Sequence, residues 1–388
     1  MLNNIYLKMD KSEVIYGIGV YGKLNSGKCT LNKELSMKYG RVDKTNWFKY
    51  NNIGYHIFPI PCIEQDYNEN FEISMLNGDI AIVMIDMSVT YNKNDIDFYD
   101  NILINCFVNN TKKVILCFNK KDIKQWNENE MNQFKDDINT MIIKYKKIYT
   151  HDIDISYVEI SIKDNQGIDT LLSLIDMSKF TLSKSNPVMM IFDSYSDKDE
   201  NTMVITGKLL QGELSLNTKL QYKNITSNTS IVSSPIKMCN SEGDYLSSLH
   251  ENSFLTVKFP LSAFSSIQAI NKSSLLLNES PLDTDYAIFD TFEASIMITS
   301  SPCSIIAKGY LCLLSSYSFI AECSIENIIG KKVLTCDKYS IAKVIIKSKE
   351  VLMRNKYELS HHLGSFSLKK EGKIIAIGVI NKYKKYNK

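Results

Sequence analysis

Residues 22–28 constrain the fold more than any other segment, because they read GKLNSGK and match the pattern G-x-x-x-x-G-K. The apolar residues 14–21 before them predict a buried strand, and residues 31–40 after them have a helical pattern. In a strand–loop–helix unit, the glycines let backbone N–H groups converge on phosphate oxygens, which the lysine also reaches. A simple glycine turn at the start of a helix is the alternative interpretation.

The pattern along the chain predicts three domains. In the first half, the apolar residues 79–86, 114–118 and 157–160 alternate with helical stretches such as 129–147, which is typical of a parallel sheet covered by helices. Beyond residue 187 the apolar runs are short, β-branched and separated by turn residues, with a second break near residues 278–286. We therefore predict an α/β domain over residues 1–183, followed by two all-β barrels over residues 187–280 and 284–388.

Composition narrows the class of protein. The chain has 45 Lys and Arg residues against 43 Asp and Glu, and this net charge of +2 gives no sign of a strongly basic surface for nucleic acid. The sequence shows no signal-peptide core and no apolar run approaching about 18 residues, so we expect a cytoplasmic protein that contacts no membrane. Nine cysteines occur without a CxxC pair, which indicates reduced thiols rather than a disulfide framework or a zinc finger.

Two further motifs follow apolar runs. Residues 119–122 read NKKD, and the aspartate of an N-K-x-D motif accepts hydrogen bonds from guanine N1–H and its exocyclic amine, which rejects adenine. Taken alone, NKKD in a chain so rich in Asn and Lys could equally be a charged helix cap. Residues 161–163 read SIK and match the S-A-K loop that closes over the base. Three motifs in this order, each at the end of a predicted strand, indicate a guanine-nucleotide site.

With these motifs, the sequence resembles translational GTPases of the elongation factor 1-alpha class over nearly its whole length. The resemblance includes residues 202–220 in the first predicted barrel and residues 363–383, which are similar to the closing hairpin of the third domain. Within this class, three segments are more similar to the GTP-binding subunit of the eukaryotic peptide-chain release factor, and these are residues 40–44, 124–138 and 371–378. The resemblance implies a P-loop G domain followed by two barrels, a GTP or GDP cofactor, and the ribosome with its rRNA as partner.

Two sets of residues follow from the resemblance. The nucleotide-binding set is Gly22, Asn25, Ser26, Gly27, Lys28, Cys29, Thr30, Asn119, Lys120, Asp122, Ser161, Ile162 and Lys163. The partner-binding set, which implies contact with a class-I release factor, is Gly364, Ser365, Phe366, Ser367, Leu368 and Lys369. The family usually has arginine at positions 365 and 369, and neither serine nor lysine offers the planar fork of a guanidinium. A plain hairpin with an exposed basic edge is the alternative interpretation of this segment.

The residues that support hydrolysis in the family are altered. The position of its D-x-x-G loop and water-positioning histidine reads PIPCI at residues 59–63, and His56 stands at the wrong place to substitute. Only 59 − 30 = 29 residues separate Thr30 from Pro59, so switch I and its threonine are largely deleted. Cys29 replaces the Ser or Thr that binds Mg²⁺ through its hydroxyl. We expect no Mg²⁺ bound in the usual way, weak or lost nucleotide binding, no catalytic residue, and impaired or lost GTP hydrolysis.

Three functions are compatible with these observations. The first is a translation termination factor that carries the class-I release factor to the ribosome and is a monomer outside that complex. The second is a ribosome-rescue factor whose partner is a Pelota-type protein, and the third is a non-enzymatic adaptor with a relict G domain. Elongation factor 1-alpha itself is disfavoured, because such a carrier needs hydrolysis in every cycle.

Overall fold

The computed structural model describes residues 15–40, 46–58, 75, 78–90, 92, 95–178, 185–223, 230–240, 243–264, 270, 274–278, 286–299, 305–317, 319–335, 337–354 and 361–384. An α/β domain is followed by two β-rich regions, which confirms the predicted fold class. Residues 179–184 and 279–285, where the predicted domain boundaries fall, lie outside the described ranges, so those boundaries stay predictions. None of the helices in these ranges is both long and apolar enough to cross a membrane.

Contacts between residues divide the chain into two compact units. The first comprises Met1–Ile18, Leu35–Phe58 and Asp176–Thr284, and the second comprises Gly19–Glu34, Pro59–Ile175 and Asp285–Lys388. The second unit therefore holds both the main part of the α/β domain and the last β-rich region.

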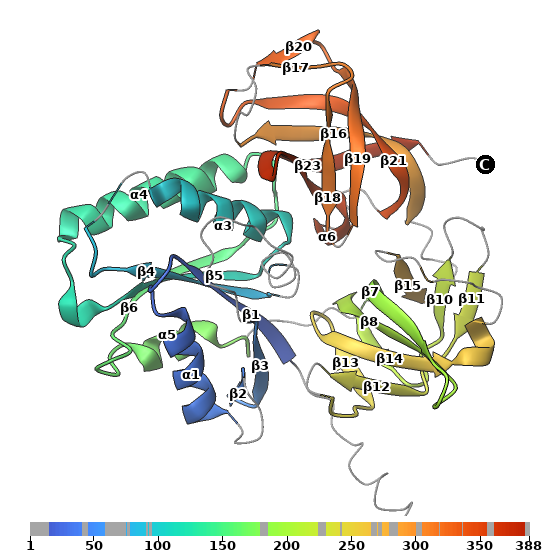
Figure 1. Cartoon of the computed structure of the whole chain (residues 1–388), viewed down its shortest axis with the longest axis horizontal. Helices are drawn as coiled ribbons and strands as arrows, with labels where there is room; N and C mark the ends of the chain where they lie inside the picture. The colour runs from blue at the N-terminus through green and yellow to red at the C-terminus, as the bar shows by residue number, and fades with distance from the viewer. Residues whose placement is uncertain are drawn as a thin grey trace, which may run out of the picture. The chain divides into compact units, whose positions relative to one another are not determined.

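The α/β domain is built on a six-stranded sheet in the order β2-β3-β1-β4-β5-β6 (Figure 1). In that order the strands are Trp47–Tyr50, Ile53–Phe58, Ile15–Gly22, Ile80–Asp86, Lys113–Asn119 and Asp154–Glu159. The helices are α1 (Lys28–Tyr39), α3 (Ile96–Val108), α4 (Glu128–Tyr145) and α5 (Ile168–Ile175). Strands β4, β5 and β6 pair in parallel, with Asp86 opposite Asn119 at their carboxyl ends, so polar residues that follow these strands meet at one edge.

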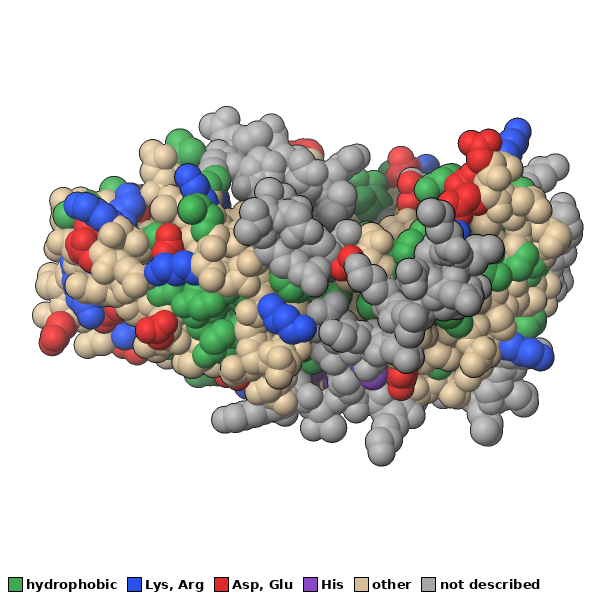
Figure 2. Space-filling model, turned by 90° about the horizontal axis from the view of Figure 1, so that it is seen from below, with side chains coloured by type: hydrophobic (Ala, Val, Ile, Leu, Met, Phe, Trp, Pro, Cys, Tyr) green, Lys and Arg blue, Asp and Glu red, His purple; other side chains and the backbone are tan. Residues whose placement is uncertain are grey.

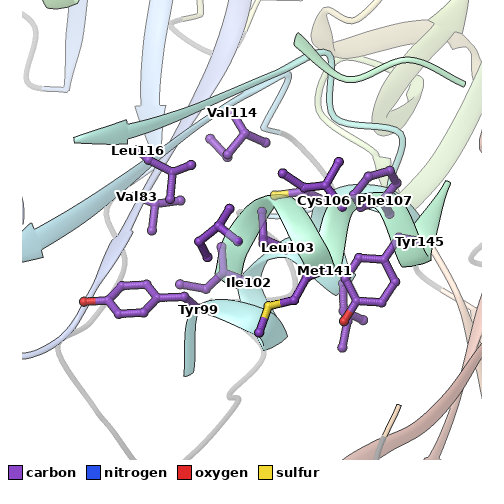
Figure 3. Close-up of a cluster of buried hydrophobic side chains, with 14 of the residues drawn as sticks. Val83, Tyr99, Ile102, Leu103, Cys106, Phe107, Val114, Leu116, Met141 and Tyr145 are labelled. Atoms are coloured by element: carbon purple, nitrogen blue, oxygen red, sulfur yellow. The ribbon is translucent and has the colours of Figure 1, made fainter. Parts of the chain in front are cut away.

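Helices α3 and α4 bury their apolar faces against this sheet. Figure 3 shows Val83 and Leu116 of the sheet facing Leu103 of α3, with Met141 and Tyr145 of α4 beside that helix. Helix α4 begins with a capping box, in which the Asn127 side chain accepts from the backbone N–H of Glu130 at 2.9 Å and the Glu130 carboxylate accepts from that of Asn127 at 2.9 Å. Each large apolar side chain buried here contributes about 1.5–3 kcal/mol to the free energy of unfolding.

The first β-rich region is a seven-stranded antiparallel sheet in the order β11-β10-β15-β7-β8-β14-β12. In that order the strands are Ser230–Ser233, Leu220–Lys223, Leu275–Asn278, Val188–Asp197, Thr202–Gln211, Phe254–Pro260 and Lys237–Asn240. Strands β9 (Glu213–Ser215) and β13 (Ser248–His250) form a separate pair. Alternate residues of the sheet enclose one apolar core, which contains Tyr222 and Phe259.

The last β-rich region is a closed barrel in the order β16-β21-β19-β18-β22-β23. In that order the strands are Ala287–Ile298, Ile341–Arg354, Phe319–Ile328, Leu311–Ser316, Ser365–Lys370 and Lys373–Lys384. The short helix α6 (His361–Gly364) precedes β22, and β17 (Ile305–Ala307) pairs with β20 (Val333–Thr335). Phe292 and Phe366 meet edge to face inside the barrel, with ring centroids 5.6 Å apart.

Within the second unit, helix α3 packs against the outer face of this barrel. Ile377 and Val379 of β23 belong to the same buried cluster as the α3 side chains. The carboxylate of Asp100 on α3 accepts a hydrogen bond from the Tyr145 hydroxyl and lies 2.9 Å from the Lys338 ammonium of the barrel. We call these groups the α3–barrel contact, and they join the α/β domain to the barrel through both apolar and ionic interactions.

Candidate functional site

The predicted phosphate loop forms between β1 and α1. Gly22 and Gly27 have φ values of 148° and 102°, and Asn25 has a φ of 61°, all in the region that side chains other than Asn rarely adopt. A Cβ atom at Gly22 would lie 2.5 Å from the carbonyl oxygen of Met84, and one at Gly27 would lie 2.3 Å from Asn119 Nδ2. Both glycines are therefore required by sterics as well as by backbone conformation.

The Lys28 side chain bonds back to the start of the phosphate loop. Its side chain is buried, and its Nζ donates to the carbonyl oxygens of Gly22 at 2.6 Å and Lys23 at 2.7 Å. Among the residues that the structure describes, no carboxylate lies within ion-pair distance of this ammonium. An ammonium has three donors, so one N–H and the full charge are left for an anion at the N-terminus of α1.

Asn119 joins the phosphate loop to the second motif. Its Nδ2 donates to the backbone carbonyl of Ser26 at 2.9 Å, although the two residues lie far apart in the sequence. Asn119 Oδ1 and Ser26 Oγ are both buried and have no hydrogen-bond partner in the described part of the chain. Leaving such atoms unpaired costs about 1–3 kcal/mol each, so a polar ligand at this place would restore stability.

Asp122 and Ser161, for which the motifs predict a role in base recognition, lie in contact. The Ser161 hydroxyl donates to Asp122 Oδ1 at 2.9 Å, and Lys163 Nζ lies 3.9 Å from Oδ2. The backbone N–H of Lys121 donates to the carbonyl of Ile160 at 3.1 Å, which holds the two loops together. A carboxylate accepts about four hydrogen bonds, so Asp122 retains acceptors for the two N–H groups of a guanine edge.

The side chain of Lys120 pairs with Asp86, a residue that belongs to none of the three sequence motifs. Lys120 has a φ of 66°, and its Nζ lies 2.5 Å from Asp86 Oδ2 at the end of β4. Ser88 donates to Asp86 Oδ1 through its N–H at 2.8 Å and its hydroxyl at 2.6 Å. Burial raises the pKa of Asp86, but the hydrogen bonds from Lys120 and Ser88 outweigh it, so the pKa lies below its usual value. Because Asp86 ends the apolar run 79–86, parallel strand ends were a signal for this contact.

A second missed residue contacts the loop from α3. Lys23 Nζ lies 2.5 Å from Asp95 Oδ1 and 5.9 Å from the centre of the Phe98 ring. Asp95 is the N-cap residue of α3, so this ion pair fixes one side of the phosphate loop to the helix that also contacts the barrel.

The metal-binding side of the site differs from that of a Mg²⁺-dependent loop. Cys29 and Thr30 follow Lys28 on α1 and are both exposed. The described residues contain no group of three or more His, Cys, Asp or Glu side chains placed to hold a metal ion. Mg²⁺ prefers oxygen ligands, and a thiol is a poor substitute for the missing hydroxyl. His56 lies in β3, where burial lowers its pKa to about 4, and residues 59–63 lie outside the described ranges.

The segment assigned to partner binding lies in the barrel wall. Gly364 and the first four residues of β22 are buried, and only Lys369 of the set is partly exposed. Phe366 and Leu368 point into the barrel core, whereas Ser365 and Ser367 lie on the outer face opposite Val379 and Ile377, the residues that pack with α3. In this arrangement an external partner would reach the lysine end of β22, and the assignment of the whole segment stays a prediction.

Comparison with known proteins gives structural matches only. No protein-family model matches the sequence, and no curated protein sequence does. Translation elongation factor SelB from Methanococcus maripaludis matches in its apo form with a TM-score of 0.64 and 14% identity, over 97% of this chain and 80% of that chain. Its complex with the GTP analogue GppNHp matches with a TM-score of 0.65 and 14% identity, over the same 97% and 80%. A bacterial selenocysteine-specific elongation factor, EF-Sec, matches with a TM-score of 0.63 and 15% identity, over 95% of this chain and 58% of that chain.

These matches establish the fold. The chain has the architecture of translation elongation factors, including one solved with a GTP analogue. The residues described above fit the guanine and phosphate groups of such a ligand, because Lys28 retains one N–H donor and Asp122 retains acceptors. They do not fit Mg²⁺ held in the usual way, because the hydroxyl ligand is replaced by Cys29.

Proposed function

We propose that this protein is a guanine-nucleotide-binding translation factor. The observation that carries the proposal is the hydrogen bond from Asn119 to Ser26, which joins the phosphate loop and the base-recognition motif into one site. The pairing of Asp122 with Ser161 supports the same conclusion at the other end of the site. A bound nucleotide would supply the phosphate charge that Lys28 and the N-terminus of α1 are placed to neutralise.

Within this class we assign the chain to translation termination, as a carrier of the class-I release factor to the ribosome. The likeness of residues 124–138 and 371–378 to the GTP-binding release-factor subunit supports this choice over ribosome rescue with a Pelota-type partner. Figure 2 shows Lys, Arg, Asp and Glu side chains interspersed over the described part of the face in view. Such a surface favours docking through shape and local contacts rather than through a broad positive field.

The proposal includes impaired GTP hydrolysis. Phosphoryl transfer depends on a metal ion that neutralises developing charge and on a group that orients water. The exposed thiol of Cys29 is a poor ligand for Mg²⁺, and the sequence has no D-x-x-G loop or following histidine at residues 59–63. The site would then bind GTP without hydrolysing it.

Nucleotide binding tests the first part of the proposal. A fluorescent GDP analogue is titrated with the full chain, and unlabelled GDP, GTP and ATP compete for it. We expect GDP and GTP to compete and ATP to fail. Asp122→Asn should weaken GDP binding about 100-fold through the loss of hydrogen bonds to a charged acceptor, while xanthine nucleotides gain affinity. Asp164→Asn, which changes an exposed acid on the neighbouring loop that carries Ser161, is the matched control and should bind like the wild type. Absence of GDP binding by the wild type would refute the nucleotide site.

Partner capture and turnover test the rest. The chain is immobilised and offered a class-I release factor and its Pelota-type paralogue at equal concentration, and we expect retention of the release factor. Multiple-turnover GTP hydrolysis is then measured with ribosomes and the release factor present. A rate comparable to that of ordinary translational GTPases would contradict the loss of hydrolysis, and preferential capture of the Pelota-type protein would favour ribosome rescue.

A further inference from the structure

Two cysteine side chains face each other inside the barrel. Cys312 of β18 and Cys323 of β19 are paired residues in the antiparallel ladder, and their Sγ atoms are 3.5 Å apart. Both residues are buried, with 5% and 2% of their surfaces exposed. The pairing register of the two strands therefore holds the two thiols in contact.

The register suits a covalent bond between them. Directly opposite residues of an antiparallel pair have Cα atoms about 4.5–5.5 Å apart, which lies inside the range of about 4.4–6.8 Å that disulfides span. Closing the sulfur–sulfur gap from 3.5 Å to a bond of about 2.05 Å needs side-chain rotation rather than a change of register. The pairing of Leu311 with Ser324 and of Leu313 with Glu322 on either side keeps the two strands aligned while this happens.

We propose that Cys312 and Cys323 form a reversible oxidation site, in which a small peroxide converts the two thiols into a disulfide across β18 and β19. The inference does not depend on the proposed nucleotide site. It concerns a part of the fold that the sequence alone presents only as two of nine reduced cysteines.

The chemistry balances with hydrogen peroxide as the oxidant. The Cys312 thiolate attacks one peroxide oxygen, so that an S–O bond forms, the O–O bond breaks, and hydroxide leaves and becomes water with the proton lost from Cys312. Cys323 then attacks the sulfur of this sulfenic acid, the S–S bond forms, the S–O bond breaks, and hydroxide leaves as water with the proton of Cys323. Both sulfurs are oxidised and both peroxide oxygens are reduced.

The two sulfurs have different roles in this sequence. The hydrogen bond between the thiols lowers the pKa of Cys312, against the effect of burial, and raises the pKa of Cys323. Cys312 is therefore the sulfur that loses its proton first, and Cys323 keeps its proton until it attacks. A small uncharged oxidant suits the site, because neither sulfur is exposed enough for direct attack by the thiolate of another protein.

The disulfide would constrain strand β18, which lies between two other strands of the barrel. Strand β18 pairs with β19 on one side and with β22, the strand assigned to partner binding, on the other. A cross-link between β18 and β19 restricts the separation of this hairpin in both the folded and the unfolded chain. Oxidation should therefore raise the thermal stability of the barrel.

Peptide mapping of the wild-type chain tests the proposal directly. The full chain is reduced, treated with graded hydrogen peroxide, blocked with N-ethylmaleimide and digested without reductant. We expect a peptide pair that joins Cys312 to Cys323, that lacks two hydrogen atoms, and that disappears after treatment with dithiothreitol. Recovery of both cysteines as maleimide adducts or as sulfonic acids, or their linkage to other cysteines, would overturn the proposal.

Variants give a second measurement on the same sample. Cys312→Ala and Cys323→Ala should each abolish the peroxide-induced rise in melting temperature. Cys106→Ala, which removes a buried thiol of the α/β domain, is the matched control and should leave that rise unchanged. A rise that persists in Cys312→Ala would also overturn the proposal, and the mapping decides the matter even if either barrel variant fails to fold.

Discussion

Replacing Lys338 with methionine should loosen helix α3 from the barrel. The substitution keeps most of the side-chain volume and removes the charge that faces Asp100, which is 3% exposed. Lys338 Nζ lies 2.9 Å from Asp100 Oδ2 and 3.2 Å from Asp97 Oδ1, so two carboxylates lose their cation at once. Burial opposes the charge on Lys338, but the hydrogen bond to Asp100 outweighs it and raises the pKa of Lys338 above its usual value.

The size of the effect follows from the exposure of the pair. Removing one partner of a fully buried ion pair costs about 3–5 kcal/mol, whereas exposed pairs contribute about 0–1 kcal/mol. The Asp100 side chain is 5% exposed and that of Lys338 is 40% exposed, so the contact lies between these limits. We expect a cost of about 2 kcal/mol, which corresponds to about 30-fold faster opening of α3.

Hydrogen exchange of the α3 amides measures this opening. Lys338→Met should speed exchange in α3 and in β23, which packs against it, and leave the seven-stranded sheet of the first unit unchanged. The double variant Lys338→Met/Asp100→Asn should lose less stability than the sum of the losses in the two single variants, by about 1 kcal/mol or more, because the two charges interact directly. Lys349→Met is the control, since Lys349 pairs with Glu322 on the barrel surface, where both side chains are mostly exposed. Exchange rates in Lys338→Met equal to those of the control would refute the reasoning.

Three other predictions follow from the site and from the titrating groups. Gly27→Ala places a Cβ 2.3 Å from Asn119 Nδ2, so it should lower the free energy of unfolding by about 2–4 kcal/mol and abolish GDP binding. Gly243→Ala is the control, because Gly243 has a similar positive φ but open space around it, and it should cost about 1 kcal/mol. Equal melting temperatures for the two variants would contradict this prediction. Cys29→Ser restores the hydroxyl and should make the affinity for GDP rise with Mg²⁺ concentration without restoring GTP turnover. Isothermal titration of the variant with and without Mg²⁺ measures this change. An affinity that does not depend on Mg²⁺ in the variant would count against the thiol as the cause of weak Mg²⁺ binding. Burial lowers the pKa of His151 from 6.5 to about 3, so below pH 6.5 the unfolded chain takes up a proton that the folded chain does not, and this group alone should lower stability by about 2 kcal/mol between pH 7 and pH 5 in denaturant titrations. His56, whose pKa burial lowers to about 4, adds a loss of the same sign, so His151→Gln should reduce the slope without removing it, and an unchanged slope would exclude a contribution from His151.

Local patterns in the sequence were sufficient to predict the strands and helices that carry the site. The apolar run 114–118 and the motif after it correspond to β5, Lys113–Asn119, because a buried parallel strand leaves a continuous apolar signal. The helix expected over 129–147 is Glu128–Tyr145, and its start is fixed by the capping box at Asn127. Asn119, Asp122 and Ser161 come together because their strands are neighbours in a parallel sheet.

Most contacts between distant segments were not accessible from such patterns. Asp86 had a signal, because it ends an apolar run beside the strand that precedes Lys120, but Asp95 is an ordinary acidic residue whose pairing with Lys23 depends on which helix start meets the loop in space. The alternation of β22 would place Ser365 on a solvated face of a hairpin. It is buried because α3 covers that face, and a strand pattern carries no information about what packs on it.

The burial of Ser365 also explains why a small residue suits this chain at a position where the family that the sequence resembles usually has arginine. The Ser365 hydroxyl donates to the carbonyl of His361 at 2.8 Å, and the Ser316 hydroxyl donates to the carbonyl of Ser365 at 2.9 Å while it accepts from the Arg354 guanidinium at 3.3 Å. A buried guanidinium therefore already lies beside this segment. A second guanidinium, at position 365, would have to leave water beside the like charge of Arg354, at a cost of several kcal/mol. A short neutral side chain at position 365 allows α3 to pack directly on the barrel wall, so serine here makes the segment that we propose for partner binding part of the protein's own interior.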